Sequence, residues 1–252
     1  MLIDGKQMHI GCVKGDVGRY VVLPGDPGRC ESIARYLDAP RHIAQNREFN
    51  VYTGSLDGVP VSVCSTGIGG PSAAIALEEL AECGADTFIR VGTSGGIVDK
   101  VCGGDVVIAT ASVRQEGTSR EYMPIEYPAA ADFDVTAALK AAAVKLGYRH
   151  HVGVIQSKDS FYGEIRPAMQ PVAAELEAKW KAWKAAGVLT SEMETAALFV
   201  VGATLGVRCG AVLNVLWNAD NDEAPNIPPD AAERGIVTAV EALRVLIAQD
   251  RK

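Results

Sequence analysis

Residues 87–96 read TFIRVGTSGG, an apolar and partly β-branched run that ends in glycines. Two earlier runs have the same form, YVVLPGDPGR at residues 20–29 and VPVSVCSTGIGGPS at residues 59–72. Such runs are typical of strands in an open α/β sheet, where ligands bind at the carboxyl ends of the strands. Glycines there let backbone N–H groups approach an anion. The three turns together predict one anion site, although each turn alone is explained equally well as a tight strand-to-helix connection.

The rest of the chain alternates between short apolar runs and amphipathic stretches. Further strands are expected at residues 105–109, 151–155 and 210–216, and Asp57-Gly58 between residues 51–56 and 59–65 predicts an antiparallel hairpin. Helices are expected over residues 29–37, 71–83, 134–146, 173–186, 191–205 and 231–248. The polar residues 218–230 are expected to form a long loop beside the site. The fold prediction is α/β, with residues 1–252 forming a single domain whose central mixed β-sheet is flanked by helices.

The composition favours a small ligand over a macromolecular partner. The 252-residue chain is 48% hydrophobic and has a formal net charge of −7, with no long Lys or Arg run, which argues against nucleic acid and anionic membranes. The six cysteines form no CxxC pair, so reduced thiols are expected rather than a zinc or redox site. No apolar run approaches the roughly 20 residues that span a bilayer, and no apolar leader precedes Gly11, so a cytoplasmic protein is expected.

Three arginines mark the predicted anion site. Arg29 and Arg90 border glycine-rich turns, and Arg47 stands in QNREF at residues 45–49. A planar guanidinium holds phosphate through two parallel hydrogen bonds. Each arginine has the alternative of a surface salt bridge, but for Arg90 this is weak because a guanidinium at the end of an apolar strand needs a buried partner. The sequence contains neither GxxxxGK(S/T) nor GxGxxG, which argues against nucleoside triphosphates and dinucleotides.

A set of motifs in register links the chain to a known family. The motifs are GDP at residues 25–27 with Arg29, REF at 47–49, CSTGIGGPS at 64–72, RVGT at 90–93, SFYG at 160–163 and SEME at 191–194. In order and spacing the chain resembles the nucleoside phosphorylase superfamily, and within it the bacterial uridine phosphorylases, from about His9 to the last helix. The resemblance implies phosphate-dependent cleavage of the N-glycosidic bond of uridine or a related pyrimidine nucleoside to uracil and ribose 1-phosphate. It also implies that no cofactor is needed and that the chains form dimers that usually assemble into a hexamer.

The resemblance further implies a role for each motif residue. It implies that phosphate is bound by Gly25, Arg29, Arg90 and Thr93, with Arg47 reaching in from a neighbouring subunit. It implies that ribose is bound by Glu192, Met193 and Glu194, together with His9 from the neighbouring subunit of the dimer. It implies that the base is bound by Phe161, Glu164 and Arg166. The catalytic residues that it implies are Arg90, Glu194 and Arg166, and a monovalent cation, K⁺, is implied at Glu48, Ile68 and Ser72.

Two of these assignments have alternatives in the sequence itself. SEME at residues 191–194 also fits a capping box, in which Ser191 caps a helix and Glu194 bonds back, and without the resemblance the cap is favoured. A lone histidine near a terminus, such as His9, would otherwise be expected to be exposed and without a role.

The base pocket departs from the family pattern. Glu164 stands where uridine phosphorylases have a glutamine, and Ala219 stands where they have an arginine. An ionised carboxylate accepts from uracil N3–H but repels O2, so replacing Glu164 with glutamine is expected to raise activity on uridine. Glu164 also suits a 6-oxopurine such as guanine, which keeps a purine nucleoside phosphorylase open, with Asp220 as a substitute acid beside Asn218. A non-catalytic nucleoside or phosphate sensor stays open too, whereas a hydrolytic nucleosidase would not need three arginines.

Overall fold

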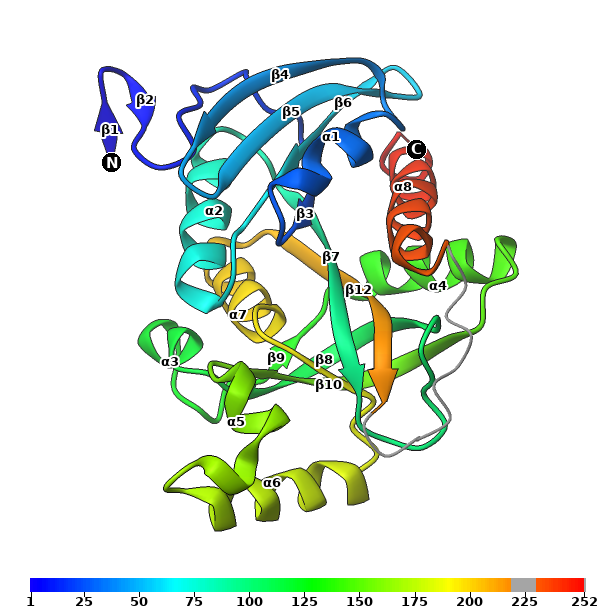
Figure 1. Ribbon diagram of the computed structural model, residues 1–252. Coiled ribbons are helices and arrows are strands. Elements are labelled where there is room, and N and C mark those ends of the chain that lie inside the picture. Colours follow the sequence, from blue (N-terminus) through cyan, green and yellow to red (C-terminus); the bar gives the residue numbers. More distant parts are fainter. Residues whose placement is uncertain (219–229, 252) are drawn as a thin grey trace.

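The computed structural model describes residues 1–218 and 230–251 of the chain. A ten-stranded mixed β-sheet forms its centre, with helices on both faces (Figure 1). Strands β1 (Leu2–Ile3) and β2 (Lys6–Gln7) form a separate two-stranded sheet. The ten strands of the central sheet are β3 (Tyr20–Pro24), β4 (Asp38–Asn46), β5 (Phe49–Leu56), β6 (Val59–Cys64), β7 (Thr87–Gly96), β8 (Val106–Gln115), β9 (Ala129–Ala130), β10 (His150–Lys158), β11 (Thr190–Glu192) and β12 (Arg208–Asn218). The helices are α1 (Gly28–Ala34), α2 (Gly70–Glu82), α3 (Thr118–Tyr122), α4 (Phe133–Lys145), α5 (Phe161–Ile165), the 3-10 helix η1 (Pro167–Met169), α6 (Ala173–Ala185), α7 (Thr195–Leu205) and α8 (Ala231–Asp250).

The strand order closes part of the sheet into a ring. Neighbours follow the order β11-β10-β8-β12-β7-β3-β6-β5-β4, and β11 pairs with both β10 and β7. The strands from β11 to β7 therefore form a closed circuit, while β3, β6, β5 and β4 extend from β7 as an open wing. Parallel pairs such as β7 with β12 occur beside antiparallel pairs such as β12 with β8, which confirms the predicted mixed sheet.

Two hydrophobic cores lie on opposite faces of the sheet because neighbouring residues of a strand point to opposite sides. Phe88 of β7 belongs to the core under α2 and α7, whereas Ile89 belongs to the core under α1, α4 and α8 (Figure 1). Helix α7 is buried along its first eight residues, Thr195 to Gly202, as expected for a helix that is apolar all round. The two cores hold the strand ends, and therefore the site, in fixed positions.

Most predicted elements are present, and the differences concern the glycine-rich segments and the edges. Residues 92–96 are not a turn, because β7 continues through them and pairs with β12 as far as Gly96. The predicted hairpin is confirmed: Leu56 pairs with Val59 across Asp57 and Gly58, whose φ angles of 51° and 76° fit a primed turn. The sequence did not indicate β4, a largely exposed strand whose one partner among the described strands is β5.

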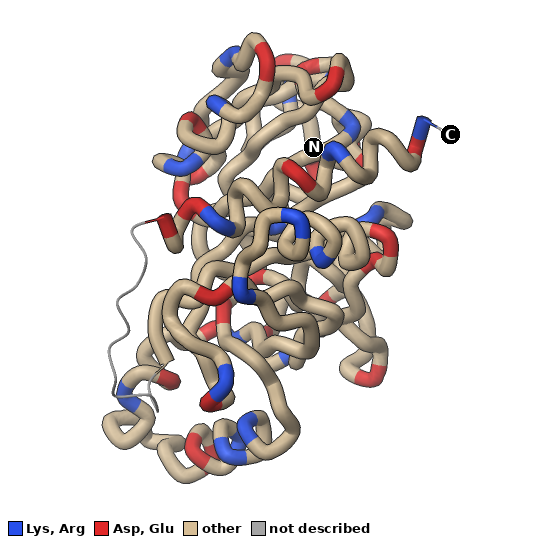
Figure 2. Tube along the Cα trace, turned by 90° about the vertical axis from the view of Figure 1, so that its right-hand side faces the viewer, with Lys and Arg blue, Asp and Glu red and all other residues tan. Residues whose placement is uncertain are grey.

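Charged residues of both signs are distributed along the described chain. In the Cα tube of Figure 2, Lys and Arg residues are interspersed with Asp and Glu residues. None of the helices in residues 1–218 and 230–251 combines the length and the hydrophobicity needed to cross a bilayer.

Candidate active site

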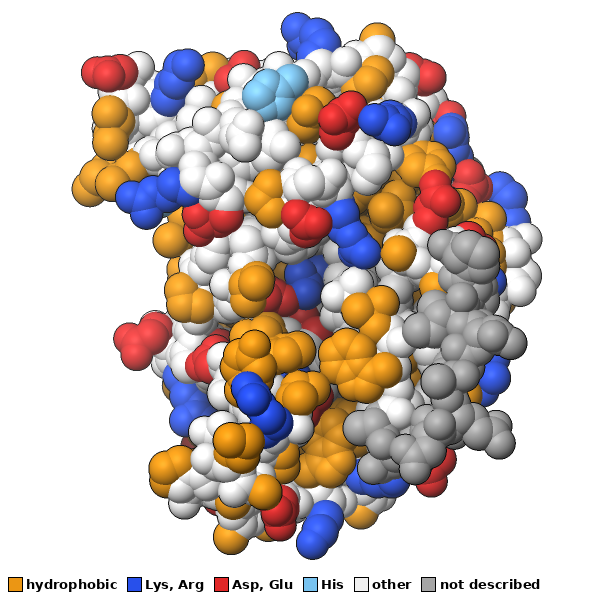
Figure 3. Space-filling view, viewed as in Figure 1, with side chains coloured by type: hydrophobic (Ala, Val, Ile, Leu, Met, Phe, Trp, Pro, Cys, Tyr) orange, Lys and Arg blue, Asp and Glu red, His pale blue; other side chains and the backbone are white. Residues whose placement is uncertain are grey.

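A cavity of about 740 Å³ opens where β3, β7 and β11 end. Its lining residues come from segments far apart in the chain: Gly25, Asp26, Pro27, Arg29, Glu48, Gly67, Ile68, residues 90–95, Lys158, Phe161, Glu164, residues 191–194 and Trp217. Figure 3 shows a hollow in this face, with basic and acidic side chains deep inside and hydrophobic side chains along its lower border. The cavity therefore joins a charged floor to an apolar wall.

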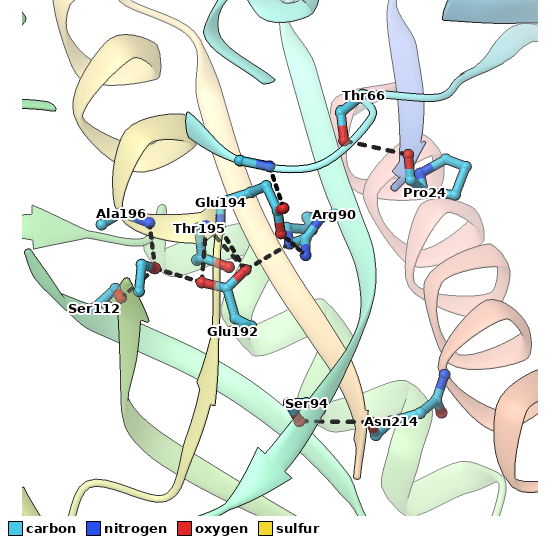
Figure 4. A network of polar contacts seen from close by, with 12 residues as sticks. Pro24, Thr66, Arg90, Ser94, Ser112, Glu192, Glu194, Thr195, Ala196 and Asn214 are labelled. Carbon is cyan, nitrogen blue, oxygen red and sulfur yellow. Dashed lines mark hydrogen bonds and ion pairs between the residues drawn. The ribbon is translucent and has the colours of Figure 1, made fainter. Parts of the chain in front are cut away.

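Arg90 lies in the floor of this cavity and is held by two carboxylates. Its side chain is only 4% exposed, its Nε donates to Glu192 Oε2 at 2.9 Å, and its Nη2 donates to Glu194 Oε2 (Figure 4). The two glutamates outweigh the effect of burial and raise the pKa of Arg90 above its ordinary value. Arg90 therefore has the buried partners that the apolar strand around it requires.

The Nη1 atom of Arg90 takes no part in these two ion pairs. Among the described residues it has no hydrogen-bond partner, although it is buried. A buried donor without an acceptor is costly, more so when it is charged. Because Arg90 lines the cavity, an anion bound there would supply the missing acceptor.

The two glutamates differ in their surroundings. Burial opposes the ionisation of Glu192, but Arg90, Ser157 and the backbone N–H groups of Glu194 and Thr195 hold its pKa below the ordinary value. Burial raises the pKa of Glu194, because Arg90 offsets it only in part and the charge of Glu192 adds to it. Glu194 also accepts from the Gly69 N–H at 2.6 Å. As pH falls, Glu194 is protonated before Glu192.

The capping box favoured by the sequence alone is not formed. Ser191 lies in β11, helix α7 begins at Thr195, and its N-cap residue Glu194 makes no side-chain cap. The Glu192 carboxylate takes that place by accepting from the first N–H groups of the helix, at 2.9 Å from Glu194 and 3.0 Å from Thr195. Since Glu192 ends a strand, both glutamates can turn toward Arg90, which two residues at that spacing on one helix would not do.

The end of the cavity beside Phe161 and Trp217 contains a second ion pair. Lys158 Nζ lies 2.5 Å from Glu164 Oε2, and both groups contact Ser191 Oγ, which accepts from Lys158 at 2.5 Å and donates to Glu164 at 2.5 Å. The aromatic rings of Phe161 and Trp217 stand nearby, with centroids 6.4 Å apart. This end therefore offers apolar surface together with a paired donor and acceptor.

Comparison with known proteins agrees with this arrangement. Residues 19–247 match the family model described as the Phosphorylase superfamily. The chain belongs to this superfamily. It is 53% identical to a protein named uridine phosphorylase from Treponema pallidum (strain Nichols), over 97% of this chain and 95% of the relative. It is 45% identical to a uridine phosphorylase from Thermococcus kodakarensis, over 99% and 90%, and 39% identical to a guanosine phosphorylase from Halorubrum lacusprofundi, over 96% and 99%.

Most of the predicted phosphate ligands meet in this superfamily member's cavity. Gly25, Arg29, Arg90 and Thr93 all line it. Burial lowers the pKa of Arg29; Asp26 opposes this shift, and the positive charge of Arg90 adds to it. Two guanidinium groups that repel one another across a cavity favour an anion between them.

Arg47 and His9 lie outside the cavity lining of their own chain. Arg47 is exposed in the turn between β4 and β5, with a left-handed φ of 53°. His9 is partly exposed, and its Nδ1 lies 2.7 Å from Glu79 Oε1. Both residues that the resemblance assigned to a neighbouring subunit are thus absent from the lining of this chain's cavity.

Two of the three predicted cation ligands are in contact. Ser72 Oγ donates to Glu48 Oε1 at 2.9 Å and also contacts the Thr66 carbonyl. The described residues include no group of three or more His, Cys, Asp or Glu side chains that could hold a metal ion.

The predicted base ligands divide in the same way. Phe161 and Glu164 line the cavity, but Arg166 is exposed, does not belong to the lining, and stacks on Tyr162 with its Cζ 4.5 Å from the ring centroid. Ala219 and Asp220 fall outside the described residues. Sequence reasoning missed Lys158 and Trp217. The position of Lys158 directly before DSFYG was the signal that could have revealed it.

Proposed function

We propose that this chain is a uridine phosphorylase, which cleaves the N-glycosidic bond of uridine with inorganic phosphate to give uracil and ribose 1-phosphate. One observation carries the phosphate-dependent part of the proposal: the buried Nη1 of Arg90 has no acceptor among residues 1–218 and 230–251, in a cavity that Gly25, Arg29 and Thr93 also line. Inorganic phosphate supplies that acceptor, and it needs no further cofactor to act as the nucleophile.

The reaction places charge at both ends of the cavity. As the C1′–N1 bond breaks, positive charge develops on the ribose and negative charge on the departing base, as in other glycosidic cleavages. Phosphate oriented by Arg29 and Arg90 attacks C1′ as a positioned nucleophile. Glu194 accepts hydrogen bonds from the ribose hydroxyls, and the negative charge of Glu194 stabilises the oxocarbenium-like transition state. Met193 lies beside the sugar, and Glu192 holds the Arg90 side chain in place.

A second copy of the chain completes the site in this proposal. Arg47 and His9 do not line the cavity of their own chain, which supports their reaching phosphate and ribose in a neighbouring subunit of a dimer. A hexamer built from such dimers, Arg166 as a base ligand, and a K⁺ ion at Glu48, Ile68 and Ser72 belong to the same proposal. A cytoplasmic location is supported by the scattered cysteines, which suit a reducing compartment.

Base release with and without phosphate tests the assignment. Uracil release from uridine is expected only when phosphate is present, and guanosine, inosine and thymidine are assayed beside it. Release without phosphate would favour a hydrolase, release from guanosine alone a purine phosphorylase, and no release from any substrate a sensor.

Arg29→Ala tests the phosphate site directly. It removes one charged hydrogen-bond donor, worth about 1.5–3 kcal/mol, so KM for phosphate is expected to rise roughly 10- to 150-fold while KM for uridine changes little. Arg35→Ala, which removes an exposed arginine paired with Glu31, is the matched control. An unchanged KM for phosphate in Arg29→Ala would contradict the phosphate site.

A further inference from the structure

The proposed reaction requires a positive charge beside the departing base, and Lys158 lies at that end of the cavity. The residue is 6% exposed at the end of β10, and its side chain lines the cavity of about 740 Å³ and an adjoining cavity of about 500 Å³. Of the described residues that line the larger cavity, Arg29, Arg90 and Lys158 are the cations. Arg29 and Arg90 stand at the phosphate end, so Lys158 is the cation of the base end.

We propose that Lys158 and Glu164 together bind the edge of the base and that Lys158 stabilises the negative charge of the departing uracil. This inference rests on the proposed function. An amide at this place would offer one acceptor and one donor in a single group. The ion pair offers the same two functions in two groups: the Glu164 carboxylate accepts from N3–H, and the Lys158 ammonium donates to a neighbouring carbonyl oxygen of the base. The repulsion expected between Glu164 and O2 is thereby removed.

The environment of the pair fits this role. A buried ammonium needs partners, and Lys158 has the Glu164 carboxylate and the Ser191 hydroxyl, each at 2.5 Å. Ser191 donates its own proton to Glu164, so it orders both charged groups at once. Ser191 belongs to the same short strand as Glu192, which binds Arg90. The base end and the phosphate end are thus fixed by neighbouring residues of one strand.

The chemical step needs no proton from Lys158. A phosphate oxygen forms a bond to C1′ while the C1′–N1 bond breaks, and the electron pair of that bond leaves with uracil. The negative charge of the departing uracil is delocalised onto its carbonyl oxygens. The Lys158 ammonium stabilises this charge effectively because it is already in place and does not have to reorient during the reaction. The uracil anion then takes its proton from water, and Lys158 keeps its three protons throughout.

The test combines Lys158→Met with two substrates that differ in their leaving group. For uridine, kcat/KM is expected to fall about 100-fold, the size found when one donor to a developing anion is removed. For 5-fluoro-uridine the loss is expected to be at least about tenfold smaller, because fluorine stabilises the departing anion and makes it depend less on the ammonium. KM for phosphate is expected to stay unchanged. Lys145→Met, which breaks a surface pair with Glu241, is the matched control.

The double variant Lys158→Met, Glu164→Gln keeps the test interpretable if the single variant folds poorly. It removes the Glu164 carboxylate together with its cation, and its loss with 5-fluoro-uridine is again expected to be smaller than its loss with uridine. Equal losses on both substrates, or no loss at all, would overturn the role of Lys158. The absence of phosphate-dependent uracil release by the unaltered protein would instead overturn the proposed function. Glu164→Gln alone is now expected to lower activity on uridine, since it removes the partner that holds Lys158 in place.

Discussion

Replacing Arg90 with alanine removes the shared partner of two buried carboxylates. The side chains of Glu192 and Glu194 are 1% and 7% exposed, so neither gains compensating contact with water. Breaking a buried ion pair by deleting one partner costs about 3–5 kcal/mol of unfolding free energy. Against a typical stability of about 5–15 kcal/mol, the variant is expected to stay folded at 25 °C but with a large loss of stability. Its phosphorolytic activity is expected to be lost, because Arg90 is the most buried of the proposed phosphate ligands.

The pH dependence of this loss separates the ion-pair explanation from simple loss of packing. In the variant, burial and mutual repulsion raise the pKa values of both glutamates above their ordinary values in the unfolded chain. The penalty is therefore absent below the unfolded pKa and grows as pH rises through the raised folded pKa values. The difference in unfolding free energy between the two proteins should be greatest at pH 7–8 and shrink toward pH 5.

Urea unfolding followed by tryptophan fluorescence at a fixed protein concentration measures this difference. With a slope of about 3 kcal/mol per molar urea, a loss of about 3–5 kcal/mol lowers the midpoint by about 1–1.7 M at neutral pH. Arg35→Ala, which breaks an exposed pair with Glu31, should lower stability by less than about 1 kcal/mol at every pH. A loss in Arg90→Ala of the same size at pH 5 and pH 8 would refute the reasoning.

Two further variants probe the same cluster from its edges. Glu192→Gln removes the negative neighbour that helps to raise the pKa of Glu194, so the acid limb of the kcat/KM profile for uridine should move to lower pH; a limb that stays in place or moves up would be evidence against Glu194 as the titrating group. Gly92→Ala would put a Cβ 2.7 Å from Leu213 Cδ2 and 2.9 Å from Arg90 Nη2, so it should displace the guanidinium and lower kcat/KM about 100-fold, and steady-state kinetics at saturating phosphate checks this.

The fold could be predicted where local pattern and tertiary structure agree. Apolar runs, the Asp57-Gly58 turn and the amphipathic stretches each carry their own signal, and the corresponding strands and helices are present. β4 was missed because an exposed edge strand needs no alternation of apolar and polar residues. β11 was missed because three polar residues are held there by partners on β7 and β10, which a local pattern does not contain.

The motifs in the sequence indicate which residue types form the site. They do not indicate how those residues pair with one another. Arg29 and Arg90 stand out beside glycines, and both line the cavity. Lys158 lies on β10, whereas its partners Glu164 and Ser191 belong to α5 and β11, so only the folded chain brings the three together. The resemblance assigned Arg166 to the base, and the motif could not indicate that its guanidinium stacks on Tyr162 in this chain.

Helix α6 has no buried residue, yet it supplies much of the wall of the cavity that adjoins the base end. Substitutions on such a helix cost little folding free energy, whereas changes at Arg90 leave buried charges without partners. The shape of the adjoining cavity can therefore change through α6 while the ion pairs of Arg90 are kept.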